Sequence, residues 1–298
     1  MTEQTPAANS TDNSLRFLFE EADIRGEVVQ LDRAFTDIVA LHQYAPGVNR
    51  LLGEFLAAAV LLSTTLKFEG KLILQARSEG QLPLLMVECN SELEIRGIVR
   101  GAEQATAETF NQLLHQGQLA ITIDPVRGNR YQGVVALEGD SLAACLDSYF
   151  QQSEQLQTRL WLACDGQRAA GMLVQQLPAQ LAPDPAQRAL QWEHVYALAS
   201  TLRDEELLQL HPTQLLHRLY HEDPLRLFEP RTVCCQCSCS RERTLAALIS
   251  LGADEVEQIL KELGSVSMDC EFCNTRYEYF REDLAELLDP AREGRTLH

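Results

Sequence analysis

The sequence predicts an α+β protein in which a mixed N-terminal core with a largely antiparallel sheet is followed by a helical linker and a small C-terminal module. Three observations predict this organisation. Short β-type runs follow one another in groups, rather than in strict alternation with helices, up to Pro178. The stretch from Pro178 to Arg231 is amphipathic and punctuated by proline. Six of the nine cysteines fall in the last quarter of the chain.

The N-terminal core is predicted from seven β-type runs, several of them separated by turn signals such as Asp165-Gly166. The runs are residues 71–77, 82–89, 93–99, 119–124, 131–137, 159–164 and 171–177. One helix is expected from about Val48 to Leu66, and another after Asp140 or Ser141, either of which can be its N-cap. This part has no glycine-rich phosphate loop, no nucleophile elbow and no catalytic His/Asp/Glu spacing, so we expect no enzymatic activity.

The linker is expected to form one longer helix and two shorter ones. On the first helix, one face gathers apolar side chains: Trp192, Val195, Tyr196, Ala199 and Leu202. Asp204 and Thr213 are candidate caps of the two shorter helices. Short isolated helices are marginal in water, so this segment should depend on packing against a neighbour and is a candidate for conditional folding. Its histidines are expected on solvated faces rather than as metal ligands.

Composition excludes several classes of partner. The formal net charge is -18, so the chain repels polyphosphate, and no local basic patch predicts nucleic-acid binding. The polar start, MTEQTPAANSTDNS, lacks the features of a signal peptide. The most apolar run, Phe55 to Leu62, is too short to span a bilayer and predicts a buried helix. We therefore expect a soluble, cytoplasmic protein with neither nucleic-acid nor membrane partners.

The C-terminal cysteines predict a zinc module. Two helices, after Ser240 and from Asp254, are expected to end at Gly252 and Gly264, followed by a hairpin whose tip is Cys-Glu-Phe-Cys and by a closing helix "EDLAELL". A module of this size rarely buries enough apolar surface to fold alone. A Zn²⁺ ion held by four thiolates would supply the missing folding free energy, which is on the order of 10 kcal/mol in small zinc modules.

Spacing leaves the ligand set open. Cys270 and Cys273 form a Cys-x-x-Cys half-site. Residues i and i+2 of an extended segment point the same way, so the other half-site is either Cys235 with Cys237 or Cys237 with Cys239. The scattered cysteines are interpreted as small buried hydrophobic residues without a role: Cys89, Cys145 and Cys164.

Several motifs resemble the 33 kDa chaperonin family, the redox-regulated heat-shock holdases. They are "CSCSRER" with "MDCEFC", "FLFEEADIRGEVV", "LLSTTLKFEGKLILQ", "RYQGVVALEGDSLAACLDSYFQQSEQL", "GMLVQQLPAQ" and "LLHRLYHED", and they cover nearly the whole chain beyond its first dozen residues. Carried over by position, the thiolates that bind one zinc ion are Cys237, Cys239, Cys270 and Cys273. Cys234 and Cys235 match no ligand position and are this sequence's departure from the family.

The resemblance implies a domain division: a disordered tail at 1–14, the chaperone core at 15–178, a metastable helical linker at 179–232, a zinc-binding redox-switch domain at 233–291, and a tail at 292–298. It also implies an ATP-independent holdase that is inactive when reduced and zinc-bound. Oxidation to two disulfides, expected as Cys237 with Cys239 and Cys270 with Cys273, expels zinc and unfolds the module and the linker.

The same resemblance implies partners. The exposed surface holds unfolding client proteins, the oxidised form is a homodimer, and clients pass to ATP-dependent foldases. As a hypothesis, the client-facing residues lie in the linker: Trp192, Val195, Tyr196, Leu202, Leu216 and Leu219. Two alternatives remain, a thiol-disulfide oxidoreductase that uses Cys270 and Cys273, and a zinc-stabilised interaction module.

Overall fold

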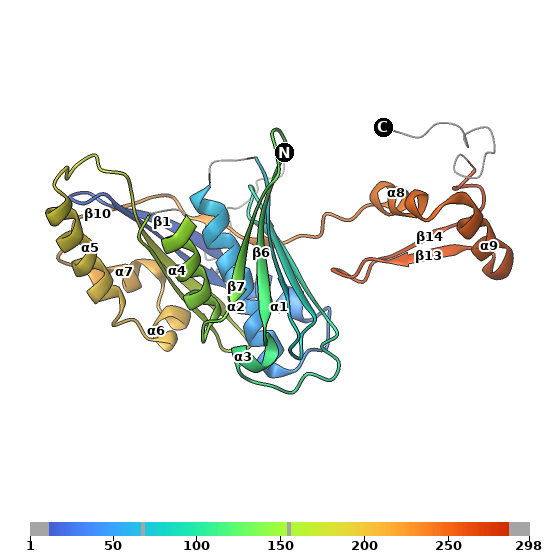
Figure 1. Ribbon diagram of the computed structural model, residues 1–298, viewed down its shortest axis with the longest axis horizontal. Helices are drawn as coiled ribbons and strands as arrows, with labels where there is room; N and C mark the ends of the chain where they lie inside the picture. The colour runs from blue at the N-terminus through green and yellow to red at the C-terminus, as the bar shows by residue number, and fades with distance from the viewer. Residues whose placement is uncertain (1–11, 67–68, 154–155, 286–298) are drawn as a thin grey trace, which may run out of the picture. The chain divides into compact units, whose positions relative to one another are not determined.

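The computed structural model describes residues 12–66, 69–153 and 156–285 (Figure 1). Backbone contacts divide the chain into two compact units, Met1–Gln236 and Cys237–His298. Among the described residues, the first contains two mainly antiparallel sheets with helices, and the second contains two helices and a hairpin. The predicted α+β class is therefore confirmed.

One sheet of the first unit has the order β12-β5-β4-β3-β6-β7. All of its neighbours are antiparallel except β12, which pairs parallel to β5. Its strands are β3 (Gly70–Arg77), β4 (Leu84–Asn90), β5 (Glu94–Arg100), β6 (Gly117–Pro125), β7 (Tyr131–Leu137) and β12 (Cys234–Cys235). The five longer strands correspond to five of the predicted runs, because their apolar side chains alternate between a core face and an outer face.

The other sheet has the order β10-β1-β2-β9-β8, with β11 also pairing with β1. Its strands are β1 (Asn13–Phe19), β2 (Ile24–Leu31), β8 (Thr158–Cys164), β9 (Ala169–Gln176), β10 (Leu225–Leu227) and β11 (Arg231–Thr232). Asn13 and Ser14, expected in the disordered tail, begin β1. Periodicity did not reveal β2, because packing on both faces buries six of its eight residues and removes the alternation.

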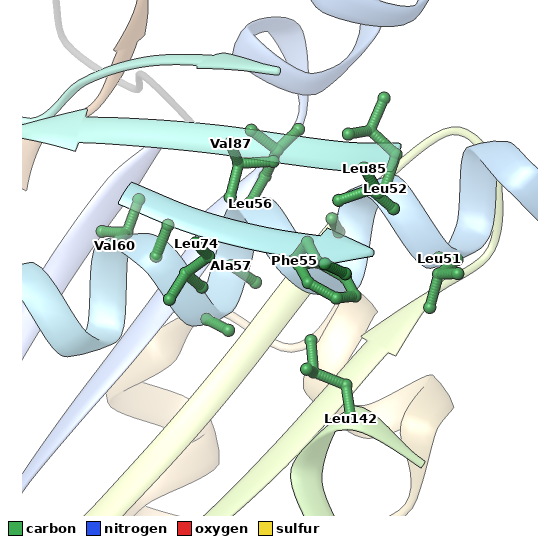
Figure 2. Close-up of a cluster of buried hydrophobic side chains, with 14 of the residues drawn as sticks. Leu51, Leu52, Phe55, Leu56, Ala57, Val60, Leu74, Leu85, Val87 and Leu142 are labelled. Atoms are coloured by element: carbon green, nitrogen blue, oxygen red, sulfur yellow. The ribbon is translucent and has the colours of Figure 1, made fainter. Parts of the chain in front are cut away.

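A single long helix, α2 (Pro46–Thr65), fills the space between the sheets and contacts strands of both. Figure 2 shows Phe55, Leu56 and Val60 of α2 among Leu74 of β3 and Val87 of β4. Although α2 is long and apolar enough to cross a membrane, 83% of its apolar window is buried inside the protein. It is therefore the core helix that the sequence predicts.

Three shorter helices complete the middle of this unit. The helix α4 (Leu142–Ser153) follows Ser141 as predicted and packs on β8 and β7. Two helices were not predicted, α1 (Arg33–Val39) and α3 (Phe110–Leu113), because seven and four residues are too few to establish a helical period.

The predicted linker helices are α5 (Pro185–Ala199), α6 (Asp204–Gln209) and α7 (Pro212–Tyr220). They bury one face against the β1-β2-β9 sheet, where the ring of Tyr220 lies 5.0 Å from that of Phe19. The predicted caps are wrong by one or two residues: Arg203 precedes α6, and the His211 ring accepts the N–H of Thr213 at the start of α7.

The residues proposed to face clients lie in this packed layer. Trp192, Val195, Leu216 and Leu219 are buried, Leu202 is half-buried, and Tyr196 is 40% exposed. In the described conformation most of these side chains therefore contact the sheet and are not open to a partner.

The segment 231–236, at the end of the first unit, is held by both sheets. β11 pairs with β1, and Val233 is buried and donates its N–H to the Asp12 carbonyl at 3.1 Å. The N–H of Cys234 donates to Leu93 O at 3.2 Å on the β5 side. Residues 233–236, which we grouped with the C-terminal module from the sequence, thus belong to the first unit by their contacts.

The second unit contains α8 (Arg241–Leu251), α9 (Ala253–Leu263) and a hairpin of β13 (Val266–Asp269) and β14 (Arg276–Tyr279). Ser240 Oγ accepts the N–H of Arg243 at 3.3 Å, as expected for a cap. The described core is small: Leu248, Val256, Leu260, Val266, Tyr279 and Leu284. Of the predicted closing helix, residues 282–285 form turns and the remainder lies outside the described residues.

Candidate metal centre

Cys237 and Cys239 lie on the segment that leads into α8. The first turn of this helix fixes the segment, because Arg243 Nη1 donates to the Ser238 carbonyl at 2.6 Å and Ser240 caps the helix. The residue between the two cysteines is therefore tied to the helix, and both thiols are half-buried.

Cys270 and Cys273 form the turn between β13 and β14. The Cys270 carbonyl accepts the N–H of Cys273 at 3.3 Å and that of Asn274 at 2.7 Å, and the Cys270 N–H donates to Thr275 O at 2.9 Å. Asn274 has φ 56°, a left-handed conformation that asparagine tolerates better than most residues. This local geometry brings both sulfurs to the same side of the turn.

The two halves meet in one cluster. The Sγ atoms of Cys237, Cys239, Cys270 and Cys273 all lie within 4.8 Å of one another. Cys237 Sγ is 3.7 Å from Cys270 Sγ, and Cys239 Sγ is 3.4 Å from Cys273 Sγ. Sulfurs of a tetrahedral ZnS₄ site with bonds of about 2.3 Å are about 3.8 Å apart. The cluster can therefore hold a metal ion.

The pKa values of the thiols indicate that a cation is needed before all four can be deprotonated. Burial raises the pKa of Cys270 to about 12, and it raises that of Cys239 as well. For Cys273 burial acts in the same direction, but hydrogen bonds with Thr275 and the neighbouring sulfurs outweigh it and lower the pKa to about 7. Four thiolates this close repel one another, so a bound divalent cation is what allows all four to be deprotonated together.

A second layer of side chains supports the cluster. Tyr277 Oη donates to Cys239 Sγ at 3.1 Å, and Cys273 Sγ lies 3.2 Å from Thr275 Oγ1. Sequence reasoning missed both residues. Only Tyr277 lies in β14, and the left-handed Asn274 separates Cys273 from Thr275, so no strand alternation along the sequence points to either residue.

The buried Tyr279 ties the hairpin to the first turn of α8. Its hydroxyl donates to the Arg241 carbonyl at 2.7 Å, and the Arg241 guanidinium lies over its ring at 4.4 Å. Arg241 also pairs with Asp283 at 2.9 Å. The hairpin and the first turn of α8 are thus joined by contacts that do not involve the cysteines.

The other cysteines lie elsewhere. Cys234 and Cys235 form β12 beside Glu94 and Ile95 of β5, and the cluster does not include them. Cys89 and Cys145 are buried in the core of the first unit, and Cys164 packs against it. Within the described part of the chain, no other group of three or more His, Cys, Asp or Glu side chains is close enough to share an ion.

The linker histidines serve as ordinary polar residues. His194 Nε2 lies 3.1 Å from the Asp223 carboxylate, and His211 caps α7. The rings of His217 and His221 pack edge to face.

Comparison with known proteins agrees with the cysteine pattern. The family model described as "Hsp33 protein" matches residues 12–280. A 33 kDa chaperonin of Pseudomonas aeruginosa (strain LESB58) is 53% identical over 280 residues, which are 93% of this chain and 94% of that protein. One of Azotobacter vinelandii is 54% identical over 286 residues, 95% of this chain and 96% of that protein.

A solved structure shows the same fold. The crystal structure of the 33 kDa chaperonin (heat shock protein 33 homolog) of Thermotoga maritima has a TM-score of 0.78 at 23% identity and covers 93% of this chain and 97% of that one. With the family match over most of its length, this chain belongs to the Hsp33 family of chaperones.

Proposed function

We propose that this chaperone is a redox-regulated, ATP-independent holdase whose reduced form binds one zinc ion and whose oxidised form binds unfolding proteins. The observation that carries the proposal is the convergence of four cysteine sulfurs within 4.8 Å, in a unit with only six fully buried apolar side chains among its described residues. A unit with so small a core is stable only when something else holds its ends together.

Zinc suits this donor set, because structural zinc sites are closed tetrahedra of Cys and His ligands. Bound zinc would stabilise the four thiolates and supply folding free energy to the unit. Cys237 and Cys239 would hold the ion from the α8 side, and Cys270 and Cys273 from the hairpin side. Tyr277 and Thr275 would orient the sulfurs.

Oxidation is proposed to convert the ligands into two disulfides, Cys237–Cys239 and Cys270–Cys273. Each disulfide forms when two thiolates lose two electrons to hypochlorous acid, which takes up one proton and leaves as chloride and water. The shortest sulfur contacts join the two halves, Cys237 to Cys270 and Cys239 to Cys273. When the cluster opens, however, only sulfurs on one segment stay close, which favours the proposed pairs.

Loss of the cluster would unfold the C-terminal unit and then the linker. The helices α5, α6 and α7 are short, and their stability rests on the apolar face of the β1-β2-β9 sheet. Their release would expose that face and the linker residues that cover it: Trp192, Val195, Tyr196, Leu202, Leu216 and Leu219. Such a surface binds unfolding chains, and the net charge of -18 keeps the protein in solution.

The protein acts in the cytoplasm, it dimerises when oxidised, and it passes clients to ATP-dependent foldases when reductant returns. It binds clients without turning them over, so it is not an enzyme.

The test follows zinc content, by native mass spectrometry, and light scattering of a heat-unfolding client before and after hypochlorite. We expect one zinc ion and no protection in the reduced protein, and zinc loss with protection after oxidation. Cys237→Ser should abolish zinc binding and regulation, whereas the matched double variant C234S/C235S should keep both. Equal protection before and after oxidation would exclude the switch.

A further inference from the structure

An apolar cavity in the first unit has a single arginine in its wall. The cavity has a volume of about 190 Å³ and is lined by residues of both sheets and of α2 and α4. Arg25 of β2 is the one charged side chain among these described lining residues. The opposite kind of wall is supplied by apolar side chains: Leu62, Leu72, Ile121, Ile123, Tyr149 and Phe150. The cavity therefore combines apolar surface with one positive charge.

Fixed hydrogen-bond partners hold Arg25 at this wall. Arg25 lies on the same face of β2 as Val29, which packs in the apolar cluster around α2. Its Nη2 donates to the Thr65 carbonyl at 3.2 Å and to Gln175 Oε1 at 2.6 Å, and its Nε donates to the same Oε1 at 3.1 Å. Gln175 is held in turn, because its Nε2 donates to Thr158 Oγ1 at 2.9 Å. The guanidinium group is thus positioned before any ligand arrives.

The charge of Arg25 is not balanced by a carboxylate. Among the described residues no Asp or Glu forms an ion pair with Arg25, and Glu27 pairs with Arg16 at 3.4 Å instead. Both arginines also bind the C-terminal end of α2, where Arg16 Nη2 donates to the Thr64 carbonyl at 3.0 Å. A helix end carries about half a negative charge, so Glu27 and this end leave about half a positive charge uncompensated.

The surroundings of Arg25 make its positive charge costly. Burial and the charge of Arg16 lower the pKa of Arg25, against the opposing effect of Glu27. An anion beside the guanidinium group would offset this cost, because an opposite charge at short range favours the ionised form. A carboxylate fits best, since its two oxygens match the planar fork of a guanidinium group.

The size of the cavity limits the rest of the ligand. An apolar cavity of about 150 Å³ accommodates one benzene molecule. A volume of about 190 Å³ therefore holds one ring with a small polar group, whereas sites for larger molecules span about 300–1,000 Å³. Tyr131 also lines the cavity and is 50% exposed, so the cavity reaches the protein surface beside this ring and a ligand can enter there.

We propose that this cavity binds a small apolar monocarboxylate the size of a one-ring aromatic acid, with its carboxylate on Arg25 and its ring against the apolar wall. The occupant is a small molecule and not a client protein, and the proposal does not rest on the redox switch. Ile24 and Val28, on the other face of β2, pack with the linker helices, so the site does not require their release. Binding is therefore expected in the reduced, zinc-bound protein.

The test titrates the reduced, zinc-loaded full chain with benzoate in a calorimeter. Benzamide has the shape of benzoate without its charge, and acetate has the charge without the ring. We expect saturable binding of benzoate and about tenfold weaker binding, or less, of benzamide and of acetate, because the charged hydrogen bond and the buried ring are both needed. Benzoate should also raise the Tm of the first unit, since it binds the folded state.

Arg25→Met should weaken benzoate binding by about tenfold or more, because it removes the charge. Ile123→Phe should do the same by filling the cavity, and it keeps the hydrogen bonds of Arg25, so it tests the site even where Arg25→Met impairs folding. The matched control is Arg77→Gln, at an exposed arginine of β3 outside the cavity wall, which should bind as the unmodified protein does.

Three results would each overturn the proposal: no benzoate binding to the unmodified protein, equal binding of benzoate and benzamide, or unchanged benzoate binding in folded Arg25→Met or Ile123→Phe. These measurements do not involve oxidation or client aggregation. Their failure would therefore leave the proposed redox-regulated holdase function untouched, and failure of that function would leave the carboxylate site untouched.

Discussion

Tyr277 donates a hydrogen bond of 3.1 Å to the sulfur of Cys239. Tyr277 belongs to β14 and Cys239 to the segment before α8, so the bond links the elements that carry the two half-sites. The same contact raises the pKa of the Tyr277 phenol to about 12. A donor to a ligating sulfur stabilises its negative charge, and such partners tune the metal affinity of a site.

Replacement of this hydroxyl should weaken metal binding without removing a ligand. We expect Tyr277→Phe to lower zinc affinity by about tenfold, as measured by competition with a chromophoric chelator. The ring is kept, so the packing of the hairpin should change little. Tyr196→Phe, on the half-exposed face of α5, is the matched control and should leave the affinity unchanged. Equal affinities of the two variants would show that the hydrogen bond does not tune the site.

The helix ends of the C-terminal unit could be predicted from the sequence pattern, but the spacing of the cysteines did not show which four of them cluster. Helix ends at Gly252 and Gly264 could be predicted, because both glycines adopt positive φ, at 95° and 81°. The choice between Cys235 and Cys239 could not be made from spacing, since both lie two residues from Cys237. The structure places Cys235 on β12 beside Ile95, a pairing with a distant strand that no local pattern encodes.

Local sequence patterns also failed to predict a strand that is buried on both faces. They did not predict the exposure of single side chains either, because that exposure depends on tertiary packing. Strand β2 has no alternation, because α2 lies on one face and the linker helices on the other. Leu263, an apolar residue at the end of α9, is 76% exposed. Only Val256 and Leu260 of that helix are fully buried, since the small unit covers a narrow stripe of the helix.

The docking of the linker should depend on its buried leucines. Leu216 is 1% exposed in the layer between α7 and the β1-β2-β9 sheet, so Leu216→Ala should cost about 2–4 kcal/mol of local stability. Hydrogen exchange of α5–α7 in the reduced protein should become faster, and protection of clients should begin at a lower oxidant dose. Leu190→Ala, at a position 68% exposed on α5, should leave both unchanged. Unaltered exchange in Leu216→Ala would mean that linker packing does not set the threshold.

Asp23 should anchor the start of the linker. Its carboxylate, 6% exposed, accepts the N–H groups of Gln180, Leu181 and Ala182 and pairs with Arg188 Nη1 at 2.9 Å. Burial alone would raise the pKa of Asp23, but these donors hold it below its ordinary value of 3.8. The ionised Asp23 carboxylate therefore contributes its full stabilisation above pH 3.8. This stabilisation is lost as the pH falls through the lower pKa of the folded protein.

We expect Asp23→Asn to cost about 2 kcal/mol and to make residues 179–188 sensitive to limited proteolysis in the reduced protein. Asp184→Asn is the matched control. Asp184 caps α5 through the N–H of Ala186, and asparagine caps a helix as well as aspartate does. Identical cleavage of both variants would contradict the anchoring role.

A rise in pH from acidic to neutral should destabilise the first unit through Glu54. This residue of α2 has its pKa raised to about 7 by burial and by the nearby carboxylate of Asp204 at the start of α6, against the opposing charge of Arg50. The folded state thus holds the proton more tightly than the unfolded state, so stability declines as pH rises from about 4.5 to above 7. The full shift corresponds to about 3 kcal/mol.

Glu54→Gln should remove this part of the pH dependence, because the amide does not ionise. Urea midpoints measured on both proteins below pH 4.5 and above pH 7 should converge at the lower pH and separate at the higher pH, with the variant the more stable. Asp147, whose pKa burial also raises to about 7, titrates in both proteins, so only the difference between the two profiles reports on Glu54. Parallel profiles would mean that Glu54 is already ionised in the folded protein and that its charge does not repel the linker helix.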